Sequence, residues 1–393
     1  MNILQVTPYF APGWAYGGPV RVCYETCTEL ARRGHKVVVY TTDSIGEHAR
    51  MNPGIPTTSL GRLQIYYFKN ISNWLAFRHH LFIAPGIIIE GKKRIKDFDI
   101  IHMVEYRTSL NVITYQYAQR YHIPYVLQGH GSIPRRMTKK GLKSVYDELW
   151  GYKLLKNASK IIAVTPTEVE QCRNMGIPDS KIEIVPNGVN LNEFTNLPIK
   201  GEFKNKYSIN SNDKMILFLG RIHPIKGIDM LVKAYAKLLN KINDVKLAIV
   251  GPDDGYLLQL RQLISDLKIE GKIVITGPLY GKDKLEAYVD ADLFVLPSLS
   301  EGFPISVLES CACGTPVLIT NGCGITDIVD HKAGLVISYD ENQMINAILL
   351  LLSNEQMRER MGEQGKLLIR ERFNWNAIVD QLEELYKSCI IAK

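Results

Sequence analysis

The alternation of apolar and polar positions near the start of the chain predicts a β-α-β unit. An apolar run over 1–8 is followed by a loop with two glycines, and residues 20–34 then show apolar positions at helical spacing up to Gly34. The next run, KVVVYTT at 36–42, is almost free of charge. Strands without polar alternation are buried on both faces, which is typical of a parallel sheet covered by helices.

The same pattern recurs along the rest of the chain. Apolar runs at 99–104, 125–131 and 160–165 predict further strands of a first sheet. The pattern restarts at Lys214, where KMILFLG precedes the helical pattern IDMLVKAYAKLLNK, and the runs VKLAIVGPD, KIVITGPL and LFVLPS follow. We therefore expect an α/β protein with two successive doubly wound units.

The stretch 184–203 lies between these units. It is rich in Asn, Pro and Gly and lacks periodicity, which is typical of a linker. With 393 residues the chain is long enough for two domains of ordinary size. We divide it into an N-terminal domain, 1–190, and a C-terminal domain, 191–375, and we expect ligands at the carboxyl ends of both sheets, in an interdomain cleft.

Composition and charge narrow the choice of partner. With 46% apolar and 22% charged residues the chain is globular, and its net charge is +7. Residues 1–200 hold 25 Lys and Arg against 15 Asp and Glu, whereas 201–393 hold 22 against 25. The basic half predicts an anionic partner, such as acidic lipid or a phosphate-bearing substrate. Nucleic acid is the weaker interpretation, because no platform of aromatic and basic residues is apparent.

The seven cysteines include no C-x-x-C pair. Cys311 and Cys313 fall within an apolar helical pattern, where small buried thiols are expected rather than metal ligands or a redox pair. This cysteine usage favours a reducing compartment, and we expect a cytoplasmic protein.

Two loops that follow predicted strands are suited to an anion. Gly17 and Gly18 precede a helix, where bare backbone and free N–H groups favour a negative charge, although a tight turn would need the same glycines. Arg221 and Lys226, in GRIHPIKGID, precede another helix. Two cations there suit a diphosphate without a metal, and a solvated pair of surface charges is the alternative.

A third such loop carries His130, which lies between glycines in LQGHGS. A single histidine is more often structural than catalytic. The flanking glycines leave the backbone open at the edge of the predicted sheet, so both interpretations stay open.

The stretch EGFPISVLE at 301–309 predicts a loop that runs into a helix. Pro304 suits a first helical position, and Gly314 suits the position just after the helix. Ile305, Leu308 and Ala312 would form the apolar stripe that packs on the sheet.

Glu301 and Glu309 then lie off this stripe, one in the loop and one on the helix flank. Structural salt bridges are one interpretation. The other is a ligand whose hydroxyls bind the carboxylates while the free N–H groups of the helix start address phosphate oxygens. A nucleotide sugar has hydroxyls on either side of a diphosphate and would satisfy both.

Taken together, these segments resemble the retaining glycosyltransferases of family four. EGFPISVLE resembles their E-x7-E motif, and GGPVRVCYETCTELARRGHKV, GHGS, VPNGVN and GRIHPIKGID resemble their other motifs in the same order. The resemblance covers nearly the whole chain. It implies the GT-B fold, with two facing Rossmann-like domains.

The resemblance also implies roles for individual residues. Glu301 would bind hydroxyls of the donor sugar and Glu309 those of the ribose, while Arg221 and Lys226 would neutralise the diphosphate and His130 would lie near the reacting sugar. The remaining donor-binding positions would be Gly17, Gly18, Gly277, Leu279, Gly302, Phe303 and Ile305. The last helix, about 376–388, would return to the N-terminal domain. Many relatives have Gly where this chain has Pro304, which removes an N–H donor.

From this resemblance we expect a metal-independent, retaining transfer of a hexose from a UDP- or GDP-sugar to a glycan or lipid-linked acceptor. The basic and apolar stretches 73–96 and 133–143 would dock the protein on anionic lipid at the inner face of the plasma membrane, although ordinary core and solvated charge would explain them too. A nucleotide-sugar epimerase of the same fold and a non-catalytic binding subunit remain as alternatives.

Overall fold

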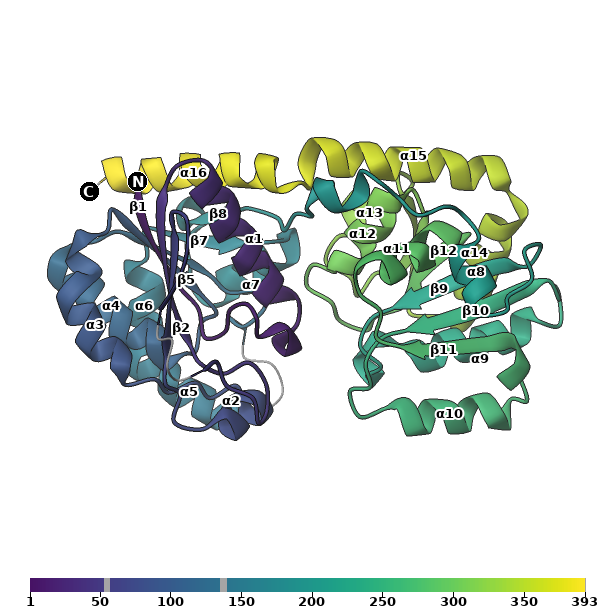
Figure 1. Cartoon of the computed structure of the whole chain (residues 1–393), viewed down its shortest axis with the longest axis horizontal. Helices are drawn as coiled ribbons and strands as arrows, with labels where there is room; N and C mark the ends of the chain where they lie inside the picture. Colours follow the sequence, from purple (N-terminus) through teal and green to yellow (C-terminus); the bar gives the residue numbers. More distant parts are fainter. Residues whose placement is uncertain (53–56, 135–139, 393) are drawn as a thin grey trace. The chain divides into compact units, whose positions relative to one another are not determined.

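The structure, a computed structural model, describes residues 1–52, 57–134 and 140–392 (Figure 1). The chain forms two units, one of Met1–Asn187 together with Trp375–Lys393 and the other of Gly188–Asn374. Each unit has one sheet covered by helices, so the predicted α/β class with two parallel-sheet domains is confirmed. Each unit is described by itself below.

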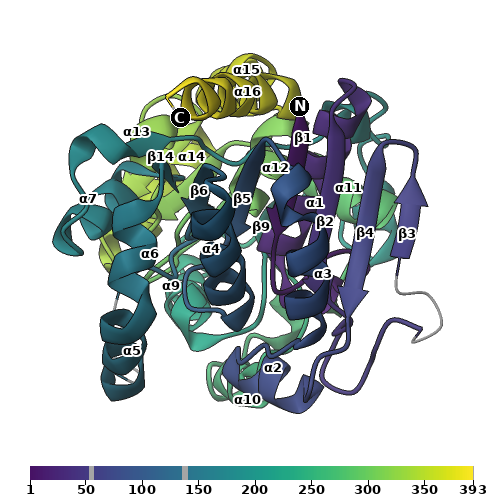
Figure 2. The same ribbon diagram turned by 90° about the vertical axis from the view of Figure 1, so that its left-hand side faces the viewer.

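The sheet of the first unit has the order β3-β4-β2-β1-β5-β6-β7-β8. The predicted strands are present as β1 (Asn2–Val6), β2 (Lys36–Thr42), β5 (Ile100–Val104), β6 (Tyr125–Gln128) and β7 (Lys160–Ala163), all parallel. The sequence analysis missed the edge strands β3 (Thr57–Leu60) and β8 (Ile182–Ile184), and also β4 (Leu63–Phe68), which lies next to β3. The β3–β4 hairpin lies at one edge of the sheet (Figure 2), where β4 alternates buried and partly exposed residues.

The helices of the first unit cover both faces of this sheet. They are α1 (Gly18–Arg32), α2 (Asn73–His79), α3 (Gly86–Arg94), α4 (Ser109–Tyr121), α5 (Lys140–Tyr146), α6 (Tyr152–Asn157) and α7 (Pro166–Asn174), with a π-helical turn at Asp147–Gly151 between α5 and α6. The core between sheet and helices is made of aliphatic and aromatic side chains such as Val6, Tyr40, Ile101 and Leu127. The predicted helix after the Gly-Gly loop is therefore confirmed as α1.

The sheet of the second unit is parallel throughout, with the order β11-β10-β9-β12-β13-β14. The predicted strands are β9 (Lys214–Leu219), β10 (Val245–Val250), β11 (Ile273–Gly277) and β12 (Leu293–Leu296). The sequence analysis missed β13 (Val317–Thr320) and β14 (Gly334–Ile337), which have only four residues each.

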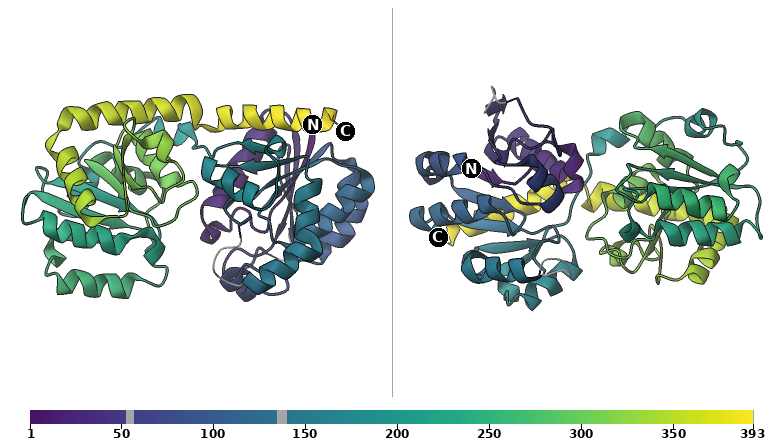
Figure 3. Two further views of the ribbon diagram at one scale, coloured as in Figure 1. Left: turned by 180° about the vertical axis from the view of Figure 1, so that it is seen from behind. Right: turned by 90° about the horizontal axis from the view of Figure 1, so that it is seen from below.

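The helices of the second unit lie on both faces of its sheet (Figure 3). They are α8 (Glu202–Lys206), α9 (Ile228–Leu238), α10 (Leu257–Asp266), α11 (Gly281–Asp290), α12 (Ile305–Cys313), α13 (Thr326–Val329), α14 (Glu341–Ser353) and α15 (Glu355–Arg372).

In both sheets the first strand of the unit is central, and the strand order reverses beside it. β1 pairs with β2 on one side and β5 on the other, and β9 pairs with β10 and β12. Ligands of such sheets bind at this switch point, beyond the carboxyl ends of the strands. The loops after β1 and β5, and those after β9 and β12, are therefore the places to look for function.

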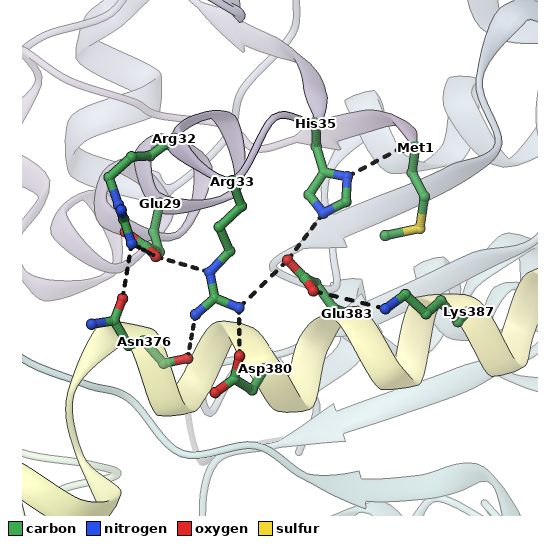
Figure 4. A network of polar contacts seen from close by, with 9 residues as sticks. All are labelled: Met1, Glu29, Arg32, Arg33, His35, Asn376, Asp380, Glu383 and Lys387. Carbon is green, nitrogen blue, oxygen red and sulfur yellow. Dashed lines mark hydrogen bonds and ion pairs between the residues drawn. The ribbon is translucent and has the colours of Figure 1, made fainter.

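The last helix, α16 (Trp375–Ile391), packs against α1 of the first unit. Its buried face includes Leu382 and Tyr386, and the Tyr386 hydroxyl lies 2.6 Å from Nδ1 of His102 on β5. A polar network joins the two helices along one side (Figure 4). Arg33, just after α1, donates to Asp380 at 2.5 Å and to the backbone oxygen of Asn376 at 2.7 Å.

The network continues to the start of the chain. His35 Nε2 lies 3.0 Å from Glu383, and the α-amino group of Met1 lies 3.1 Å from Nδ1 of the same ring. Glu29 forms ion pairs with both Arg32 and Arg33. The side chain of Arg32 is 66% exposed, whereas that of Arg33 is 18% exposed. Shielded ion pairs are less screened than exposed ones, so Arg33 should contribute most to holding α16.

We expect Arg33→Ala to loosen α16 without unfolding the unit. The variant loses several charge-assisted hydrogen bonds, which together contribute about 1–2 kcal/mol. Hydrogen exchange should report this as roughly 5–30-fold faster exchange of the α16 amides. Arg32→Ala is the matched control, with little change expected, and equal rates in the two variants would contradict the role of Arg33.

Candidate functional site

The loop after β9 is held against the loop after β12. Gly227 has a φ of +65°, and a Cβ at this position would lie 2.0 Å from the backbone oxygen of Pro297, so only glycine fits. Leu299 N donates to Ile225 O at 2.9 Å. This close approach brings the predicted cationic loop beside Glu301.

Lys226 and Glu301 form an ion pair, and both side chains are mostly shielded, with exposures of 13% and 21%. The backbone of Glu301 is fixed on both sides, because its N–H donates to Gly322 O and its carbonyl accepts from Gly324 N, both at 2.9 Å. The structure therefore brings two of the predicted site residues together. Their charges lie at the β9–β12 switch point, where Lys226 could bind an anion and Glu301 could accept a hydrogen bond from a hydroxyl.

Arg221 lies on the same loop but has a different partner. Its guanidinium donates to Asp254 at 2.5 Å, and its side chain is 59% exposed. An exposed pair of this kind is weakly held and can exchange partners. Arg221 is thus an exposed cation near the strand ends, whereas Lys226 is shielded in its pair with Glu301.

Glu309 is buried, which the sequence analysis did not predict. Its carboxylate accepts from Nζ of Lys284 at 2.6 Å and from the hydroxyl of Tyr288 at 3.1 Å, both from α11. The side chains of Lys284 and Glu309 are only 11% and 7% exposed. Lys284 was also missed, and no motif around it would have revealed it.

The predicted apolar stripe on α12 was wrong at two of its three positions. Ile305 and Ala312 are only partly buried, whereas Val307, Leu308 and Cys311 are buried. The helix packs on α15 as well as on the sheet, and a Cβ on Gly365 of α15 would lie 3.3 Å from Cα of Cys311. A helix covered on two sides has no single stripe, and a buried carboxylate on it needs a charge partner.

The start of α12 also differs by one residue from the prediction. Pro304 is the N-cap residue, with φ −73° and ψ 108°, and the helix begins at Ile305. The free backbone N–H groups at the start of the helix therefore belong to Ile305 and the residues that follow it, not to the proline. Gly314 follows the helix in the left-handed conformation, as predicted.

The other predicted donor-binding positions of this unit are next to Glu301 in sequence or lie at and just after the end of β11. Gly302 is partly exposed, while the ring of Phe303 is buried and lies 6.1 Å from that of Phe373, so only its backbone is available. Gly277 ends β11, and Leu279 is a partly exposed residue of the following loop.

In the first unit the structure places Gly17 and Gly18 at the start of α1. Gly17 has a φ of +86°, which supports the need for glycine in the turn, and nothing lies near a Cβ added at Gly18. The loop after β6 holds His130, whose φ is +46° and whose burial lowers the pKa to about 4. His130 is therefore neutral at pH 7 and cannot act as a cation there.

One polar group of this unit escaped the sequence analysis. Glu105 directly follows β5, and its carboxylate accepts from the hydroxyl of Tyr9, which follows β1. A charged residue directly after an apolar run, as in IIHMVEY, was the available signal.

The remaining chemistry-bearing residues are accounted for by packing. The cysteines are buried with free thiols, as predicted, and burial raises the pKa of Cys311 to about 12. Over the described residues, no group of three or more His, Cys, Asp and Glu side chains could hold a metal ion. Within the same part of the chain, no helix is long and apolar enough to cross a membrane.

Two family models match the chain in succession. Residues 16–193 match the model described as Glycosyltransferase Family 4, and residues 199–368 match the model described as Glycosyl transferases group 1. Between them they account for most of the chain, one in each unit. The chain belongs to the glycosyltransferases that these models describe.

Individual proteins agree with this assignment. The chain is 28% identical to the uncharacterized glycosyltransferase MJ1607 of Methanocaldococcus jannaschii, over 98% of each chain. It is 25% identical to the D-inositol 3-phosphate glycosyltransferase of Gordonia bronchialis, over 98% of this chain and 86% of the other.

Among solved structures, Anabaena HepE in complex with UDP and glucose has the same fold. It has a TM-score of 0.78 at 17% identity, and the match covers 99% of this chain and 100% of the other. The likeness supports the GT-B fold expected from the sequence.

We expect Lys284→Met to destabilise the second unit strongly. Removing one partner of a buried ion pair leaves the other charge unpaired, which costs about 3–5 kcal/mol. Thermal unfolding should show a midpoint roughly 10 °C lower. Lys282→Met on the same helix is the matched control, because that side chain is 67% exposed. The pair has no such role if both variants unfold at one temperature, or if Glu309→Gln fails to relieve the effect of Lys284→Met.

Proposed function

We propose that this glycosyltransferase moves a hexose from a nucleoside diphosphate sugar, UDP- or GDP-linked, to a hydroxyl of a glycan or lipid-linked acceptor with retention of the anomeric configuration. The observation that carries the proposal is the shielded Lys226–Glu301 pair at the β9–β12 switch point. A cation and a carboxylate held side by side suit a ligand in which phosphate and sugar hydroxyls are adjacent.

The second unit would bind the donor. Lys226 and Arg221 would neutralise the diphosphate, with Arg221 leaving Asp254 to do so, and Glu301 would accept hydrogen bonds from sugar hydroxyls. Glu309, oriented by Lys284, would hold the ribose, and backbone at Gly277 and Leu279 would line the base pocket.

The chemistry of transfer would depend on positioning and charge. As the sugar–phosphate bond lengthens, negative charge grows on the departing diphosphate, where Lys226 and Arg221 would stabilise it. The acceptor hydroxyl would approach from the same face, and the departing phosphate would take its proton. No metal is required in this scheme, because the two cations supply the positive charge.

Two comparisons support parts of the proposal. HepE is described in complex with UDP and glucose, which favours UDP-glucose as the first donor to test. The name of the Gordonia bronchialis relative specifies a hydroxyl-bearing acceptor, inositol phosphate. This name favours transfer to an acceptor hydroxyl over epimerisation of the donor.

We expect calorimetry with UDP-, GDP- and ADP-sugars to detect tight binding of one donor, in the micromolar range. Lys226→Met should weaken that binding by about 10–100-fold, because a charge-assisted contact to phosphate is lost. Lys282→Met, the same change at an exposed position of the same unit, should have no effect, and neither should EDTA.

Other outcomes would point elsewhere. A strict requirement for Mg²⁺ would contradict the metal-free scheme. Conversion of the donor to a different nucleotide sugar would identify an epimerase, and binding without transfer or hydrolysis would identify a non-catalytic subunit.

The first unit would bind the acceptor and a membrane surface. On α3, Ile88 and Ile89 are exposed at 49% and 64%, and Lys92 and Lys93 follow one turn later on the same face. Trp74 on the neighbouring α2 is also 49% exposed. An exposed face with apolar and basic residues is typical of helices that lie on anionic bilayers. The second basic stretch, 133–143, lies partly outside the described residues.

We expect the protein to float with liposomes that contain acidic lipid, at low salt, and to be released by high salt. Lys92→Glu/Lys93→Glu should abolish flotation, because it replaces attraction with repulsion. Lys237→Glu/Lys241→Glu in the second unit is the control with the same change of charge. Equal flotation of both variants would rule out docking through α3, and no flotation of the native protein would rule out a protein peripheral to the membrane.

A further inference from the structure

Glu105 has an unusual backbone conformation that its neighbours enforce. Its φ is +65°, in the left-handed region that residues other than glycine and asparagine seldom adopt. The amide of Asn111 donates to the backbone oxygen of Glu105 at 2.7 Å, and Glu105 N donates to Gln128 O at 2.9 Å. Strained residues that are held in this way concentrate at functional sites.

The carboxyl group of Glu105 lies at the β1–β5 switch point of the first unit, between loops that follow three adjacent strands. Tyr9, after β1, donates its hydroxyl hydrogen to it. Ser132, after β6, lies near the same group, and its hydroxyl donates to Gly129 O at 2.5 Å and accepts from Tyr106 N at 2.9 Å. Arg107 donates to Ser132 O at 2.6 Å, which fixes the β6 loop.

The surroundings make this carboxyl group costly to ionise, although Glu105 as a whole residue is partly exposed. The ring of Tyr9 stacks on Tyr16 at 5.2 Å, and Phe82 packs edge-on at 5.7 Å. No ion pair to Glu105 is formed within the described residues, and burial raises its pKa to about 7. The other titratable groups that face it are Cys23 on α1 and Glu168 on α7.

A second polar group of the same sheet edge is left for a ligand. His130 also has a left-handed backbone, with φ +46°, and within the described part of the chain its shielded Nε2 has no hydrogen-bond partner. Glu105 satisfies the buried hydroxyl of Tyr9, but Nε2 of His130 lacks a partner within the described residues, and a buried polar group without a partner is costly. Their conformations are explained if both contact a polar ligand.

We infer that Tyr9, Glu105 and His130 form the part of the first unit that binds the acceptor, with Glu105 accepting a hydrogen bond from a hydroxyl of a sugar or polyol. Tyr9 would hold the carboxylate in place, and the neutral His130 ring would contact a neighbouring hydroxyl. The inference rests on the proposed function, because it supposes that the protein transfers a sugar to a hydroxyl. It goes beyond that function by naming the group that selects a hydroxyl compound over water.

The test is the partition of one donor between two acceptors. The full 393-residue chain turns over UDP-glucose, or the donor found by calorimetry, in 1 M glycerol, and the ratio of glycosylated glycerol to free sugar is measured. Both products come from the same donor complex, so the ratio reports the acceptor site alone. Glu105→Gln should lower the ratio about tenfold, as expected for loss of a charge-assisted hydrogen bond, with no change in donor affinity.

Glu183→Gln, the same change on β8 of the same sheet, should leave the ratio unchanged. In the native protein the ratio should rise with pH through about 7 as Glu105 ionises, and in Glu105→Gln it should be flat. A purely structural role would not produce this difference in pH profile. Tyr9→Phe, which keeps the ring, provides a second variant and should lower the ratio less, about threefold.

The outcomes separate the two proposals. An unchanged ratio in a folded Glu105→Gln protein, or hydrolysis with no glycosylated glycerol in the native protein, overturns the inference and leaves the proposed function standing. A native protein that releases no sugar from any donor overturns the proposed function itself.

Discussion

The parallel pairing of the central strands is the constraint on which every candidate residue depends. β1 pairs with β5 from Ile3↔Ile100 onward, and β9 pairs with β12 at Leu293↔Ile216. Parallel pairing sends the chain out at one edge of each sheet, so loops distant in sequence emerge side by side. The contact between Gly227 and Pro297 is a direct result, and without it Lys226 would not reach Glu301. The same geometry brings Tyr9 to Glu105 in the first unit.

Burial then decides what each charged group can do. The Lys226–Glu301 pair is shielded but still reachable from solvent, so a ligand with phosphate and hydroxyl groups can replace each partner's contact with the other. The Lys284–Glu309 pair is more deeply buried, and separating it would leave a desolvated charge. Glu105 has no cation at all among the described residues, and its raised pKa is the consequence. The three carboxylates have similar chemistry but different surroundings. A ligand can replace the partner of Glu301, Glu309 is held in its buried ion pair, and Glu105 titrates near neutral pH.

Most of the fold could be predicted, because long apolar runs and helical spacing are local signals. The errors lie where the local hydrophobic pattern is weak, or where an element is covered on more than one side. The strands β13 and β14 were missed, although β12 is equally short and was predicted, and β4 alternates buried and partly exposed residues. Helix α12 was assigned a single apolar stripe, whereas α15 packs on a second side and Glu309 is buried against Lys284 and Tyr288 of α11. Lys284 could not be predicted as the partner of Glu309, since 25 residues separate them and only packing joins them.

The amino-acid sequence by itself determined the α/β class, the two units, and the loops that follow the central strands, because these depend on hydrophobic periodicity and on glycine and proline within a few residues. The tertiary structure alone decided which charges meet. Lys226 pairs with Glu301, and Arg221 pairs with Asp254. Glu309 is buried beside Lys284, and Glu105 accepts a hydrogen bond from Tyr9. Ionisation and hydrogen bonding depend on distance and dielectric in three dimensions, and neither is encoded in the spacing of residues along the chain.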